Sequence, residues 1–188
     1  MKSVLLGGLL GGVVLFVWGF VSWTVLPWHN TTLNAFGDES AMINAVAANA
    51  PKRGIYMIPG ERNSSGLTEE EKKAHEEASM KRMVEGPFVF AAVSPQGTAG
   101  MGPAMIGAFV IQFLGAALAT FLLMRATAMP YLAKAAFVML LGLFAGIVAH
   151  APYWNWWGFP ADYTLVAVAD LVIGWTLAGL VIARIAKN

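Results

Sequence analysis

Four long apolar stretches dominate the pattern of hydrophobic and polar residues along the chain. The first, Ser3–Trp28, contains no charged residue, and the others cover Pro103–Met124, Pro130–His150 and about Asp162–Ala183. A transmembrane α-helix needs about 20 predominantly apolar residues, and each stretch reaches that length. The pattern therefore predicts an all-α membrane protein with four transmembrane helices.

The first apolar stretch could also belong to a cleaved signal peptide, because Lys2 gives it a short charged start. The stretch is longer than the apolar region of a signal peptide, it contains Trp18 and Trp23, and no A-x-A cleavage site follows it. We therefore interpret residues 1–28 as the first transmembrane helix.

A polar segment, residues 29–102, separates this helix from the other three, which occupy residues 103–188. A segment of this size cannot bury a large core alone. We expect it to form a small α+β loop domain that leans on the membrane surface, on the helices or on a partner.

Local signals predict the elements of this loop domain. Asp38 or Ser40 is placed to cap a helix over Ala41–Asn49, and the capping box Thr68–Glu71 begins a second helix that ends near Val84. Two short apolar runs indicate strands at Ile55–Ile58 and Phe88–Val93. A polar stretch between them indicates a turn at Arg62–Gly66.

Basic residues near the ends of the four stretches fall on one side if the helices alternate in direction. The short connection on the other side, Ala151–Ala161, has no Lys or Arg, and long loops translocate largely regardless of charge. The positive-inside rule then places both termini in the cytoplasm and residues 29–102 outside it. The basic residues are Lys2, Arg125, Lys134, Arg184 and Lys187.

Composition and missing motifs exclude several functional classes. The chain has no Cys, which rules out disulfides, Cys-ligated zinc, iron–sulfur clusters and thiol nucleophiles. A net charge of +1 gives no field that attracts nucleic acid. No P-loop, G-x-S-x-G, H-E-x-x-H or dinucleotide-binding pattern occurs. We therefore predict no catalytic residue and expect a protein that is not an enzyme.

Glycines recur at four-residue spacing in the first and third apolar stretches. Small residues at this spacing let helix backbones approach closely in lipid. They are typical of packing within a bundle or of association with another copy or subunit. The candidate packing residues are Gly7, Gly8, Gly11, Gly12, Gly142 and Gly146.

Asp170 is the one ionisable residue well inside a predicted span, about 12 Å beyond Asp162 at 1.5 Å per residue. An intramembrane carboxylate is costly unless it has a partner, so it marks a functional site by default. Gln112, Trp18 and Ser22 are expected at a similar depth and could hydrogen-bond to it. The group is either a polar clasp within the bundle or a proton-transfer or ligand-binding site.

Three further polar residues are predicted at the outer ends of the helices, namely His29, His150 and Asp162. Imidazole with a carboxylate can ligate a metal, and two imidazoles can ligate haem. Ordinary polar residues at helix ends are the alternative. We predict no cofactor, and a haem or metal site at these residues stays open.

Aromatic residues gather at the same predicted membrane face. An aromatic belt at the headgroup level is one interpretation. A pocket for a lipid, quinone or pigment and a subunit interface are the others. The residues concerned are Trp154, Trp156, Trp157 and Phe159, with Trp28 from the end of the first helix.

Three stretches near the helix ends carry a resemblance: Pro27–Asn30, Asn155–Phe159 and Tyr163–Asp170. In these stretches the chain resembles an uncharacterised group of small four-helix bacterial inner-membrane proteins. The resemblance implies bacterial origin and a four-helix topology over most of the chain, and it transfers no catalytic residue. With the charge pattern, it predicts a multi-pass protein of the bacterial inner (plasma) membrane.

The leading functional hypothesis is an accessory or scaffold subunit of a larger membrane complex. Its expected partners are the lipid bilayer and other membrane subunits or a second copy, without nucleic acid. The alternatives are a binder or carrier of a hydrophobic small molecule and proton-coupled transport centred on Asp170.

Overall fold

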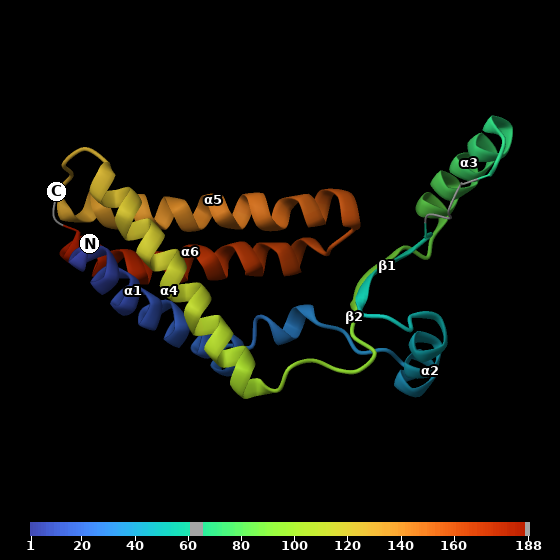
Figure 1. Ribbon diagram of the computed structural model, residues 1–188, viewed down its shortest axis with the longest axis horizontal. Coiled ribbons are helices and arrows are strands. Elements are labelled where there is room, and N and C mark those ends of the chain that lie inside the picture. Colours follow the sequence, from blue (N-terminus) through green and yellow to red (C-terminus); the bar gives the residue numbers. More distant parts are fainter. Residues whose placement is uncertain (61–65, 187–188) are drawn as a thin grey trace. The chain divides into compact units, whose positions relative to one another are not determined.

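The chain divides into two compact units, which we describe separately (Figure 1). The computed structural model describes residues 1–60 and 66–186. The bundle unit comprises Met1–Asn34 and Ala99–Asn188, and the loop unit comprises Ala35–Thr98.

Four helices of the bundle unit are long and apolar enough to cross a membrane. They are α1 (Lys2–Phe20), α4 (Met101–Arg125), α5 (Tyr131–Trp157) and α6 (Ala161–Ile185). The prediction of four such helices from the apolar stretches is confirmed. A π-helical turn, Val21–Val25, prolongs α1.

The four helices form two pairs, α5 with α6 and α1 with α4, and α1 also packs on α6. In Figure 1 Met1 and the last turn of α6 lie at one end of the bundle, and the two pairs are close together there. Toward the opposite end, α1 diverges from α6. We call the first of these the terminal end of the bundle. The core contains Leu15, Leu123, Val138 and Ile182, with alanines from α4, α5 and α6 around it.

Glycines set how closely these helices approach. A Cβ atom on Gly12 would lie 2.9 Å from Cα of Phe113, so α1 meets the backbone of α4 at this point. Gly7 and Gly8 also face α4, and Gly11 faces α4 and Ile182 of α6. On α5, Gly142 receives the ring of Trp175 and Gly146 faces Val168, both of α6. All six glycines therefore face helices of the same chain.

Polar contacts tie α5 to the last turns of α6. The Lys134 ammonium is buried and donates to the carbonyl of Ala186 at 2.7 Å, and the Tyr131 hydroxyl donates to the carbonyl of Leu180 at 2.9 Å. A carbonyl near a helix C-terminus is a favourable partner for a cation. These bonds close the terminal end of the α5–α6 pair.

Helix α5 extends beyond its predicted end at His150. It continues through Pro152 to Trp157, and Gly158 ends it with φ 67°, a left-handed conformation that suits glycine. The loop predicted over Ala151–Ala161 is therefore wrong, since only residues 158–160 connect α5 to α6. Proline is a frequent helix-stop signal, but here α5 continues through Pro152.

The loop unit contains two capped helices and one hairpin. Helix α2 (Glu39–Asn49) is capped by Asp38, which accepts a hydrogen bond from Ala41 N at 2.8 Å. Helix α3 (Glu69–Glu85) begins with the predicted capping box of Thr68 and Glu71. Strands β1 (Gly54–Ile58) and β2 (Val89–Val93) pair antiparallel. The predictions of both helices and both strands are thus confirmed. The turn predicted at 62–66 lies mostly outside the described residues, and Lys187 also lies outside them.

The described part of the loop unit has almost no core. Neither α2 nor α3 has a buried residue, and only Ala50 and Pro59 are buried among residues 35–60 and 66–98. Its secondary structure is therefore held by hydrogen bonds within each element and by caps, with little apolar burial.

Candidate functional site

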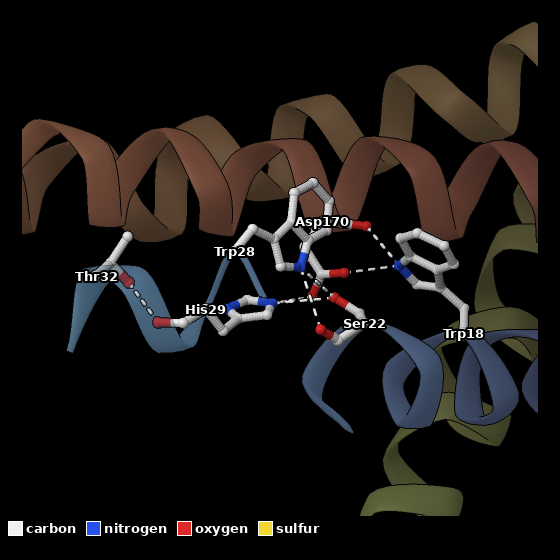
Figure 2. A network of polar contacts seen from close by, with 6 residues as sticks. All are labelled: Trp18, Ser22, Trp28, His29, Thr32 and Asp170. Atoms are coloured by element: carbon white, nitrogen blue, oxygen red, sulfur yellow. Dashed lines mark hydrogen bonds and ion pairs between the residues drawn. The ribbon is translucent and has the colours of Figure 1, made fainter. Parts of the chain in front are cut away.

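The polar site of the bundle unit is built around Asp170 (Figure 2). Asp170 lies in the first half of α6, and its side chain is 18% exposed. Figure 2 shows the side chains that are linked to it, directly or through one another, from α1 and from the segment after α1: Trp18, Ser22, Trp28, His29 and Thr32. We call these residues with Asp170 the Asp170 network.

Trp18 of α1 is the closest partner of the carboxylate. Its indole Nε1 donates to Asp170 Oδ1 at 2.7 Å and to the carbonyl oxygen of Asp170 at 3.1 Å. Gly174, one turn further along α6, makes room for this indole, because a Cβ atom there would lie 2.7 Å from Trp18 Cδ1. The small residue and the carboxylate together bind one tryptophan across the α1–α6 contact.

The second side of the site comes from the chain beyond α1. The π-helical turn ends at Leu26, which is extended, and a 3₁₀ turn follows at Asn30–Thr32. His29 stands between them and is 4% exposed. Its Nε2 atom lies 3.0 Å from Ser22 Oγ and 3.6 Å from Asp170 Oδ2. His29 was predicted at the outer end of the first helix, and its side chain lies against α6 beside Asp170.

Aromatic rings hold this imidazole in place. The ring of Trp23 stacks on His29 with 3.9 Å between centroids, and Trp28 contacts it edge-on at 5.6 Å. Trp28 Nε1 donates to Ser22 Oγ at 3.0 Å. Thr32 Oγ1 donates to the carbonyl of His29 at 2.9 Å, which fixes the following turn.

The arrangement lacks the geometry of a Ser–His–Asp triad. In a Ser–His–Asp triad the serine and the aspartate contact different imidazole nitrogens. Here Ser22 and Asp170 both face Nε2 of His29, and Ser22 is fully buried. Every buried side-chain nitrogen and oxygen in the described parts of the chain has a hydrogen-bond partner. When the His29 imidazole is protonated, His29 and Asp170 form a partly buried ion pair between the segment after α1 and helix α6.

The other residues expected near Asp170 or His29 lie apart from this network. Gln112 is half-buried on α4, and no hydrogen bond joins it to Asp170 among the described residues. Asp162 is exposed and accepts a hydrogen bond from Tyr163 N at 2.8 Å. His150 lines a separate hollow of about 180 Å³ with Tyr153, Phe159 and Tyr163. Over residues 1–60 and 66–186, no three His, Asp or Glu side chains group as metal ligands.

The predicted aromatic cluster is divided between several environments. Trp154 and Trp156 lie on the last turns of α5 and are 53% and 72% exposed, whereas Trp157 and Phe159 are half-buried. Trp28 belongs to the Asp170 network. Phe159 also lines the hollow beside His150.

Sequence reasoning placed Trp18, Ser22 and Asp170 at one depth but missed His29 and Trp28 as members of the same site. Pro27, directly after the first apolar stretch, was the available signal, because proline ends a helix and lets the chain change direction.

Comparison of the chain with protein-family models, with curated proteins and with solved structures found no match.

Proposed function

We propose that this chain is a non-catalytic accessory subunit of a membrane complex, and that a partner protein completes the core that its loop unit lacks. The observation that carries the proposal is the contrast between ordered secondary structure and absent burial in that unit. A two-stranded hairpin and single helices are marginal in water by themselves. A unit built from them needs a surface to pack against.

The apolar residues available for such packing are large and exposed. Val84 and Met80 are 89% and 61% exposed and lie four residues apart on α3, so they share one helix face. Ile55 and Ile58 of β1 are 62% and 53% exposed. Exposed apolar groups of this kind are typical of interaction surfaces.

A protein fits this surface better than the bilayer does. Helix α3 carries acidic residues in its first turn and a basic residue in its last turn, with charged side chains along its length. Inserting such a helix into hydrocarbon would cost several kcal/mol per charge. A protein surface can contact Met80 and Val84 and leave these charges in water.

The proposed setting is the bacterial inner membrane, with both termini in the cytoplasm and the loop unit outside. Four basic residues at the terminal end of the bundle support this orientation through the positive-inside rule. They are Lys2, Arg125, Lys134 and Arg184. The Asp170 network then holds the segment that leads from α1 into the loop unit.

The two alternatives, a ligand site beside the Trp154–Phe159 stretch and proton transport centred on Asp170, receive less support from the geometry. The hollow beside His150 measures about 180 Å³, which is below the roughly 300–1,000 Å³ of typical ligand pockets. Asp170 Oδ1 is held by Trp18, and Oδ2 faces His29. A carrier or a proton path would need these groups to be released.

Native mass spectrometry of protein extracted gently from its own membranes tests the proposal. We expect the wild-type chain to carry a partner protein and the double variant Met80→Glu/Val84→Glu to lose it by at least about tenfold, since a tenfold loss is only about 1.4 kcal/mol. Ala78→Glu is the matched control, because residue 78 lies on the opposite side of α3. A wild-type chain that is partner-free, or a double variant that retains its partner, would overturn the proposal.

A further inference from the structure

A groove opens between α1 and α4 at the terminal end of the bundle. It has a volume of about 500 Å³ and is lined by Met1, Val4, Leu5, Phe121, Met124 and Arg125. Five of these six side chains are apolar, and Arg125 is the single charged group. The groove lies entirely within the bundle unit and is remote in the chain from Asp170.

The size and the lining of the groove suit an extended apolar ligand. Its volume falls within the roughly 300–1,000 Å³ typical of ligand sites. Leu5 and Phe121 are 58% and 42% exposed, so they present apolar surface that the helices themselves leave uncovered. Because α1 and α4 are long enough to cross a bilayer, the groove opens toward lipid near a membrane surface.

Arg125 brings positive charge to this apolar groove. It stands in the last turn of α4, with its guanidinium 5.1 Å from the centroid of the Phe121 ring. Among the described residues, no carboxylate lies within ion-pair distance of it. Lys2, the neighbour of Met1 on α1, is exposed and adds a second cation at this end. A guanidinium in this position can bind a phosphate oxygen pair.

We infer that the α1–α4 groove binds one anionic phospholipid, with its phosphate on Arg125 and an acyl chain along Leu5 and Phe121. Charge complementarity selects an anionic headgroup, because the one charged side chain that lines the groove, Arg125, is a cation and Lys2, the neighbour of Met1, is another. The apolar lining selects a lipid over a free anion, which would meet one arginine and little else. The inference requires the helices to cross a bilayer, and it is independent of the partner proposed for the loop unit.

Native mass spectrometry of the purified full chain in detergent, titrated with phosphatidylglycerol or phosphatidylcholine of the same acyl chains, tests the inference. We expect phosphatidylglycerol to bind roughly fivefold to thirtyfold more tightly, as one or two basic residues near a membrane surface would produce. Arg125→Gln should reduce this preference by about fivefold, the share of one basic residue. Arg184→Gln is the matched control, because Arg184 lies at the terminal end over the Tyr131 ring and outside the groove.

Two further arms separate the lipid from other ligands. Leu5→Trp should fill the groove and reduce the binding of both lipids, since Leu5 is exposed and tolerates a larger side chain. Soluble glycerol phosphate should not compete, and effective competition would identify a free-anion site instead. If Arg125→Gln does not fold, Arg125→Lys replaces it in the test. This variant keeps the charge and should bind phosphatidylglycerol at an intermediate level. Equal binding of the two lipids, or equal losses in Arg125→Gln and Arg184→Gln, would overturn the inference.

Discussion

The bundle unit and the loop unit use the same kinds of local signal and reach different degrees of burial. In the bundle unit, glycines bring helix backbones into contact, and side chains such as Leu123, Val138 and Ile182 are removed from solvent. In the described part of the loop unit, caps and a hairpin define each element, yet only Ala50 and Pro59 are buried. Caps and turns therefore determine where elements begin and end, whereas burial depends on what each element finds to pack against.

The largest expected effect comes from breaking a glycine contact in the bundle unit. Gly12→Leu would force a side chain into the Phe113 backbone, where a Cβ atom alone would lie 2.9 Å from Cα. We expect a loss of about 3 kcal/mol or more in the free energy of unfolding, because backbone cannot rotate away as a side chain can. Unfolding in detergent micelles would measure it.

Gly19→Leu on the same helix is the matched control for this contact. Nothing lies within 4 Å of a Cβ atom at Gly19, so we expect a change within about 0.5 kcal/mol. Equal losses for the two variants would show that glycine acts through the flexibility of α1 and not through the α1–α4 contact.

The next effect compares one isoleucine from each unit. Ile182 is fully buried and touches the face of Gly11, whereas Ile55 is 62% exposed. We expect Ile182→Ala to cost about 2–5 kcal/mol and Ile55→Ala less than about 0.5 kcal/mol in the purified chain. Thermal unfolding of both variants without a partner gives the comparison. A large cost for Ile55→Ala would mean that the loop unit has a core of its own.

The Asp170 network should show an intermediate effect. Asp170→Ala removes the carboxylate that Trp18 and His29 share, which we expect to cost about 1–3 kcal/mol. Trp18 keeps the carbonyl of residue 170 and His29 keeps Ser22 as partners. Asp170→Asn keeps an acceptor for Trp18 and should cost less. Because the chain has no Cys, Thr32→Cys gives a single thiol at a buried position of the same segment.

Thiol labelling then shows whether the segment after α1 leaves α6. We expect Thr32→Cys to label slowly in the otherwise wild-type chain and faster with Asp170→Ala. Thr31→Cys, at an exposed neighbour, should label quickly in both. Unchanged protection of residue 32 would show that Asp170 does not hold this segment.

The parts of the fold and of the site that could be predicted from the sequence are those that depend on local signals along the chain. Apolar stretches and caps act over a few turns, so the four long helices, α2 and α3 were predicted close to their observed bounds. The end of α5 was missed because Pro152 is accommodated inside the helix. The contact between His29 and Asp170 was missed because it depends on the path of the chain after α1, which brings His29 Nε2 3.6 Å from a carboxylate that follows much later in the sequence.

The smallest effect concerns the capping box of α3. Thr68 N and Thr68 Oγ1 donate to Glu71 Oε2 at 2.8 and 3.0 Å, and these bonds hold the pKa of Glu71 below its ordinary value of 4.5. A lowered pKa means that the carboxylate stabilises the folded cap fully above that ordinary value and loses this contribution as the pH falls through the lowered pKa. Protection of the first turn of α3 from hydrogen exchange should therefore decline as the pH falls below 4.5 and through the lowered pKa.

The variant Glu71→Ala should show weak protection of this turn already at neutral pH and little further change in acid. Glu70→Gln, an exposed neighbour in the same turn, should keep the pH dependence of the wild type. Because α3 has no buried residue, a pH-dependent cap should alter exchange in this helix without altering the unfolding of the bundle unit. A parallel loss of bundle stability would mean that the two units fold together and that the contrast between them is weaker than their burial indicates.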